Sequence, residues 1–307
     1  MSVRHGGSIA CTRRAPAAAL DGRSARSSWA SIRRATSEEA ALLRIGIATP
    51  TPAATTGRLG LLELTATRRR LPEREEIAAW PRSGPAGLLL DVDAYDLLAA
   101  RRLPVAALPH DLGTDPRLPA RPALADLSDE ARYRIWERFR AALDPLRAAG
   151  TLGAVVFRYG PALRPGDAGE AKLATLAERL PNDRLAVELT RAWRTAAARD
   201  RTVPVLRAGG LTLVDRLVAD HDPRRQYAFE VTSDRLALLR LRPHRAGGPR
   251  RARLDEPPWP FGPGVRPAWL VGVQRLNDRV DEVHLVVDAP PLDAVVAVAR
   301  LWDALRA

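Results

Sequence analysis

The chain has 307 residues, of which 46% are hydrophobic, and it carries a formal net charge of +12. This length fits one α/β barrel, which needs about 250 residues plus loops. The apolar runs fall well short of the roughly 18 to 20 residues that span a bilayer, so we expect a soluble protein with no membrane partner.

The first 40 residues are rich in Arg, Ser and Ala and contain almost no acidic residues. Seven arginines lie within residues 1–36 against the single carboxylate of Asp21, so about half of the net charge comes from this stretch. We predict a disordered leader over residues 1–40 and one domain over 41–307. A wrongly assigned start, a targeting segment and a nucleic-acid-binding arm are the other interpretations of the leader.

Cys11 is the only cysteine in the chain and belongs to the leader. An intrachain disulfide and a cysteine-based metal site are therefore excluded. The cytoplasm is the simplest compartment for such a chain.

Beyond the leader, short runs rich in Val and Leu alternate with longer amphipathic stretches. Such runs, bounded by Gly or polar residues, are typical of buried strands. The expected strands are residues 44–48, 60–66, 87–95, 153–159, 185–190, 211–216, 236–242 and 283–289.

The clearest helix signal begins at Ser128, a favourable N-cap residue, and is followed by two acidic residues in the first turn. Apolar residues then recur every four positions, and Gly150 suits the C′ position that ends a helix. Further helices are expected at residues 73–80, 168–180, 267–282 and 290–307.

Eight strands alternating with helices predict a parallel sheet that closes into a single (β/α)8 TIM-type barrel. An open, doubly wound sheet is the alternative, but no Gly-x-Gly-x-x-Gly motif follows the first strand. The long, Pro-rich loops at residues 103–126 and 243–265 are expected on the C-terminal face, where barrel enzymes bind substrates.

Several segments resemble the YecE-like family, also called domain of unknown function 72. Residues 62–72 resemble its second-strand segment, with Glu63 and Thr67 retained and two arginines where an aromatic pair is usual. In residues 90–94, Asp93 stands in place of a lysine, and in residues 157–161 Arg158 stands in place of a glutamine.

The resemblance continues through the later strands. Residues 185–193 retain Glu188 and Trp193 of an Ala-Val-Glu-Phe-Arg and Trp signature, but carry Thr190 for the arginine. In the later segments, Asp215 and Arg240 match the family pattern. Arg242 and Asp288 stand where the family has other residues. The resemblance implies a TIM-type barrel with no agreed activity, in a divergent member whose polar strand ends have changed.

Residues at the ends of barrel strands face the site, which identifies the candidate residues here. Glu188 and Asp288 are the candidate catalytic residues, as general bases. Bidentate guanidinium groups could hold a phosphate or a carboxylate. The candidate ligand-binding residues are Glu63, Asp93, Arg158, Asp215, Arg240 and Arg242. Mutual neutralisation of these charges, without catalysis, is the competing interpretation.

Other chemistries find little support. The five histidines are scattered and show no ligand spacing, and interleaved arginines disfavour a metal held by the strand-end carboxylates, so we expect no metal and no cofactor. No nucleophile elbow and no phosphate-binding loop occur. Trp259 and Phe261 could stack on a sugar or base, but packing on the barrel rim is the favoured role.

Three functions remain open. The first is a non-catalytic family member that binds a small anionic ligand. The second is a hydrolase or isomerase acting on a phosphorylated or acidic small molecule. The third, least favoured, is a nucleic-acid-binding barrel, suggested by the net charge.

Overall fold

The computed structural model describes residues 42–49, 59–83, 86–218, 229–242, 269–276, 278–289 and 298. The predicted leader and the loop at 243–265, with Trp259 and Phe261, lie outside these residues. So does the predicted helix at 290–307, apart from Val298.

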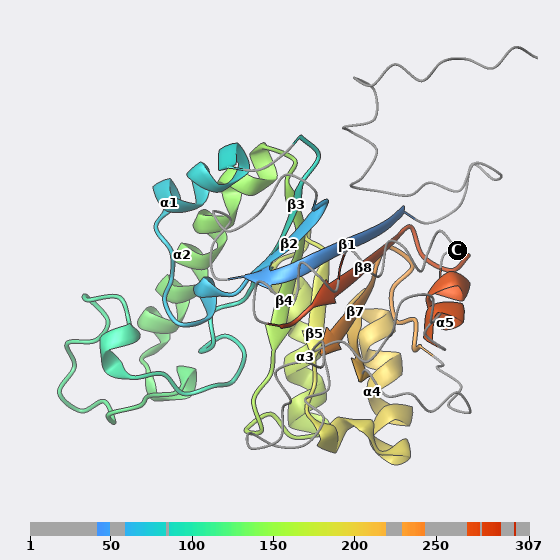
Figure 1. The fold of residues 1–307 in the computed structure, drawn as a ribbon. Helices are drawn as coiled ribbons and strands as arrows, with labels where there is room; N and C mark the ends of the chain where they lie inside the picture. Colours follow the sequence, from blue (N-terminus) through green and yellow to red (C-terminus); the bar gives the residue numbers. More distant parts are fainter. Residues whose placement is uncertain are drawn as a thin grey trace, which may run out of the picture.

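Eight parallel strands form one closed barrel in which each strand pairs with its neighbours in chain order (Figure 1). The ring closes where β1 pairs with β8, with Ile47 opposite Val287. The prediction of a (β/α)8 barrel is confirmed. The strands are β1 Leu42–Thr49, β2 Leu61–Leu64, β3 Leu89–Asp93, β4 Leu152–Arg158, β5 Leu185–Glu188, β6 Thr212–Val218, β7 Ala237–Arg242 and β8 Glu282–Val287.

Helices pack around the outside of the ring, with α1 beside α2 and α3 beside α4 (Figure 1). Short 3-10 helices occur in the connections. The longer helices are α1 Arg74–Ala79, α2 Asp129–Ala148, α3 Asp167–Arg179, α4 Ala196–Ala208 and α5 Trp269–Leu276. Among the described residues, no helix is both long and apolar enough to cross a membrane.

The ends of α2 follow the sequence prediction. The Ser128 hydroxyl accepts a hydrogen bond from the Ala131 amide, which satisfies one of the free donors of the first turn. Gly150 adopts a positive φ of 63°, the left-handed conformation that suits glycine after a helix. Both sequence signals therefore mark real helix boundaries.

Two helices differ from the prediction. The region predicted as one helix over 267–282 forms α5 only to Leu276, and Glu282 already belongs to β8, so that prediction was wrong at its C-terminal end. Helix α4 was not predicted, because Pro204 and the charged run before it obscure its apolar stripe. Thr195 caps α4 by accepting a hydrogen bond from the Ala198 amide.

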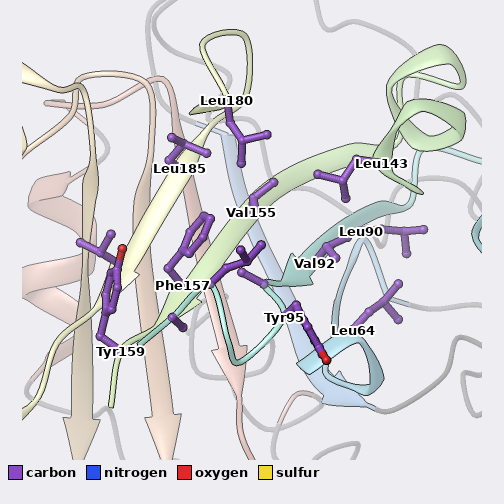
Figure 2. Close-up of a cluster of buried hydrophobic side chains, with 14 of the residues drawn as sticks. Leu64, Leu90, Val92, Tyr95, Leu143, Val155, Phe157, Tyr159, Leu180 and Leu185 are labelled. Atoms are coloured by element: carbon purple, nitrogen blue, oxygen red, sulfur yellow. The ribbon is translucent and has the colours of Figure 1, made fainter. Parts of the chain in front are cut away.

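The main hydrophobic core lies between the ring and the helices. Figure 2 shows part of it, with Phe157 and Val155 of β4 directed toward the same buried layer as Leu143 of α2. A second, smaller cluster fills the inside of the ring. Since side chains alternate along each strand, the strands are apolar on both faces, as expected for a sheet covered on one side and closed on the other.

Candidate functional site

The inside of the barrel is built in layers, because every second residue of a strand points into the ring. The middle layer is apolar and contains Leu61, Val156, Ala186, Val214, Leu238 and Val286. Two positions further along the same strands comes a charged layer at the C-terminal mouth. Together with Asp93 of β3 it forms what we term the mouth cluster: Glu63, Asp93, Arg158, Glu188, Arg216, Arg240 and Asp288.

Glu63 is the centre of the mouth cluster. Its two carboxylate oxygens each accept a 2.7 Å hydrogen bond from the guanidinium of Arg240, in the bidentate geometry that arginine favours. Arg158 also donates to Glu63, and its Nε lies 3.0 Å from Asp93 Oδ1. Glu63, Asp93 and Arg240 are completely buried, so this part of the cluster is a desolvated ion-pair network.

Glu188 extends the network toward β6 and β7. Its Oε2 lies 3.0 Å from Arg240 Nε, and its Oε1 accepts a 2.6 Å hydrogen bond from Arg216 Nε. Glu188 is buried, whereas Arg216 is exposed. Arg216 is therefore the most exposed charged side chain of the cluster.

Asp288 lies where the network meets solvent. Its Oδ2 is 3.6 Å from Arg158 Nη1 and 3.8 Å from Arg240 Nη1, and its side chain is 27% exposed. The Nη1 groups of two buried arginines therefore converge on one partly exposed carboxylate. Asp288 is the most exposed carboxylate of the cluster, and the two guanidinium groups behind it are buried.

The two buried carboxylates on β2 and β3 have opposite pKa shifts. Burial raises the pKa of Glu63, but the charges and hydrogen bonds of Arg240 and Arg158 outweigh it and bring the pKa to about 2. Burial and the negative charge of Glu63 raise the pKa of Asp93 to about 8, despite Arg158. At neutral pH these shifts favour an ionised Glu63 and a protonated Asp93.

Six of the eight predicted site residues meet in the mouth cluster, and Asp215 does not. Asp215 belongs to the opposite face of β6, where its carboxylate accepts a hydrogen bond from the Glu230 amide and burial raises its pKa to about 6. The side chain of Arg242, at the end of β7, lies outside the described part of the structure.

Arg216 is the cluster member that the sequence prediction missed. Its neighbour Asp215 fits the family resemblance, but alternation along β6 sends the two side chains to opposite faces. The signal was present: Arg216 follows Val214 by two positions, as Arg240 follows Leu238.

A second buried cluster lies at the opposite, N-terminal end of the ring. His284 Nδ1 is 2.9 Å from Asp91 Oδ2, and Glu282 joins this pair to Arg44 and Arg184. Burial lowers the pKa of His284, but Asp91 and Glu282 outweigh it and raise the pKa to about 9. We term these five residues the basal cluster.

Metal ligation has no geometric basis in the described part of the chain. No group of three or more His, Cys, Asp or Glu residues there is arranged to hold an ion. In the mouth cluster, guanidinium groups occupy the positions between the carboxylates.

Fold and site together define a parallel (β/α)8 barrel whose C-terminal mouth is sealed by paired arginines and carboxylates. The profile of the family described as protein of unknown function DUF72 matches residues 53–307. The chain therefore belongs to the DUF72 family, which confirms the YecE-like resemblance.

Solved structures show the same fold. A DUF72 family protein from Enterococcus faecalis V583 aligns with a TM-score of 0.65 at 16% identity, covering 86% of this chain and 98% of that one. A DUF72 family protein from Thermotoga maritima MSB8 aligns with a TM-score of 0.59 at 15% identity, covering 86% and 99%. No curated protein matches the chain.

Proposed function

We propose that the barrel binds a small anionic molecule, a phosphate or carboxylate, at its C-terminal mouth and that it is a non-catalytic member of its family. The observation that carries the proposal is the convergence of Arg158 and Arg240 on Asp288. Asp288 occupies the place of a ligand anion, held at ion-pair distance from both arginines.

The electrostatics of the mouth support an anion more than a cation. Asp93 retains its proton at neutral pH, so one carboxyl of the cluster contributes no negative charge to balance its arginines. Arg216 and Arg68 have partly exposed side chains at the rim. An anion approaching the mouth would therefore meet exposed guanidinium groups as well as the carboxylate of Asp288.

The family resemblance points the same way. It sets Asp93 at a lysine position and Arg158 at a glutamine position, and these two side chains contact each other. Compared with the family pattern, β3 lacks a positive charge at Asp93, and β4 has an additional one at Arg158. The substitutions therefore rearrange the charges of the mouth and do not remove them.

Titration calorimetry with inorganic phosphate tests the proposal. Asp288→Asn removes the carboxylate that competes with the ligand, and we expect it to tighten phosphate binding by about ten-fold, corresponding to about 1.4 kcal/mol. Absence of phosphate binding by both the native protein and Asp288→Asn would overturn the proposal.

Asp111→Asn is the matched control. Asp111 also pairs with two arginines, Arg134 and Arg138, but these lie on the exposed face of α2. Exposed pairs contribute little and are screened by salt. We expect Asp111→Asn to leave phosphate binding unchanged, and equal tightening by both variants would indicate nonspecific anion binding.

A hydrolase or isomerase acting on a phosphorylated or acidic small molecule is the second candidate function. It is favoured by the presence in one cluster of a partly exposed carboxylate, Asp288, and of a second carboxyl, Asp93, whose raised pKa favours the protonated form at neutral pH. Glu188, the other candidate base, is buried between Arg240 and Arg216. Turnover of a chromogenic aryl phosphate that disappears in Asp288→Asn would favour this function over simple binding.

A further inference from the structure

A pocket of about 370 Å³ lies outside the ring, in the groove between α2 and α3. Two helical stripes line it. Asp129, Arg132, Tyr133 and Trp136 on α2 recur at intervals of three or four, as do Lys172, Thr175, Leu176 and Arg179 on α3. Its volume falls in the range of small-molecule sites.

Aromatic rings form one wall of the pocket and are held in place by the core. The ring centroids of Trp136 and Phe157 are 6.3 Å apart, and those of Phe157 and Tyr159 are 6.2 Å apart. Tyr159 also lines the pocket. Tyr133, by contrast, is 57% exposed. An exposed ring beside a rigid aromatic wall offers a surface on which a planar ligand could stack.

The pocket carries an excess of positive charge. Among the described residues that line it, Asp129 is the only one with a carboxylate, and that carboxylate is bonded to Arg132. The guanidinium of Arg179 lies 5.8 Å from the centre of the Trp136 ring. Among the described residues, neither the Arg179 guanidinium nor the Lys172 ammonium forms an ion pair with a carboxylate.

Lys172 is the only lysine of the chain, and it is half-buried in this pocket. Burial lowers its pKa, and among the described residues no carboxylate offsets that effect. A half-buried ammonium in a pocket lined by aromatic rings is suited to a ligand that brings both a negative charge and a flat apolar body.

We propose that this pocket binds a planar aromatic carboxylate, with the ring against Tyr133 and the carboxylate at Lys172 and Arg179. The site is separate from the mouth cluster. Arg158 and Tyr159 adjoin at the end of β4, but alternation sends Arg158 into the ring and Tyr159 to the outer face. This inference does not depend on the proposed function.

The single lysine allows a direct test on the full chain. Labelling of Lys172 by trinitrobenzenesulfonate is followed by peptide mass spectrometry, with benzoate, benzyl alcohol or inorganic phosphate as competitor. We expect millimolar benzoate to slow labelling about five-fold, while the neutral ring and the ring-free anion have little effect. Equal protection by benzyl alcohol or by phosphate would overturn the proposal.

Substitutions at the exposed rim complete the test by calorimetric titration with benzoate. Tyr133→Ala and Lys172→Gln are expected to weaken binding about five-fold or more, while Tyr133→Phe and Lys172→Arg retain it. Arg134→Ala changes an exposed neighbour outside the pocket and should have no effect. Asp288→Asn should also leave benzoate binding unchanged, and unchanged binding in Tyr133→Ala would contradict the proposal.

Discussion

Glu63 and Asp93 show how a residue's surroundings decide its chemistry. Both are buried carboxyls in one cluster and both contact Arg158. Only Glu63 also holds the bidentate pair with Arg240, and its pKa falls to about 2 while that of Asp93 rises to about 8. The two carboxyls should therefore respond differently to the same amide substitution.

Glu63→Gln is expected to destabilise the protein by about 3–5 kcal/mol, because it leaves two arginines buried without their central carboxylate. Asp93→Asn replaces a carboxyl that is already neutral at pH 7, and its expected cost is about 1 kcal/mol or less. Urea unfolding at pH 7 measures both. Equal losses would mean that Asp93 is ionised in the folded protein.

The raised pKa of His284 leads us to expect a loss of stability at alkaline pH. Its pKa is raised from 6.5 to about 9 in the folded state, and the pKa of its partner Asp91 is also raised, so the pair holds its proton tightly. The stabilisation that protonated His284 contributes is fully present below about pH 6.5. It is lost as the pH rises through about 9, which lowers the free energy of unfolding by about 3 kcal/mol.

Unfolding free energies measured from about pH 6 to 10 test this prediction, with His284→Asn as the comparison. The variant is expected to start less stable and to show a flatter profile. Parallel profiles for the two proteins would show that His284 is not the titrating group.

At the scale of the elements, the site follows from the two-residue period of the strands. Leu61, Val156 and Leu238 form the apolar floor, and the residues two positions later, Glu63, Arg158 and Arg240, form the charged layer. A shift of one residue in any strand would turn its charged group outward under the helices. The register of each strand is thus as important to the site as the identity of its last residue.

The close approach of β1 and β2 depends on Gly46. A β-carbon at this position would overlap the carbonyl oxygen of Leu61, a main-chain atom that cannot move aside. Gly46→Ala is therefore expected to cost about 3 kcal/mol or to prevent folding.

Gly150→Ala is the control for Gly46→Ala. Gly150 has a positive φ, but its added β-carbon would meet no atom within 4 Å. Its expected cost is about 1 kcal/mol, from the backbone conformation alone. Thermal unfolding of the two variants distinguishes steric overlap from backbone preference, and similar costs would contradict the argument.

At the scale of the whole molecule, barrel closure brings together residues that are far apart in the sequence. Glu282 of β8 is bonded to Arg44 of β1 and to Arg184, which precedes β5. Many other arginines in the described part of the chain are likewise paired with carboxylates, so a large net charge does not amount to a free basic surface.

This distribution of charge predicts where any nucleic-acid affinity would come from. A chain beginning at Ala40 is expected to lose binding to duplex DNA, since the removed residues carry seven arginines against three carboxylates, a net charge of +4 out of +12. Mobility shifts at about 50 and 200 mM salt measure it. Retained binding with a steep salt dependence would identify the barrel itself as a nucleic-acid-binding surface.

The sequence by itself determined the eight-strand pattern, the barrel, the family resemblance and most of the mouth residues, because strand period and helix caps are local signals. Helix α4 was missed, since Pro204 and its charges hide a stripe that only packing reveals. The tertiary structure alone decided that Arg216 joins the mouth cluster and Asp215 does not, and that the pKa of Asp93 is raised. Facing direction and pKa depend on neighbours brought together by closure of the ring, and such neighbours are not encoded at short range.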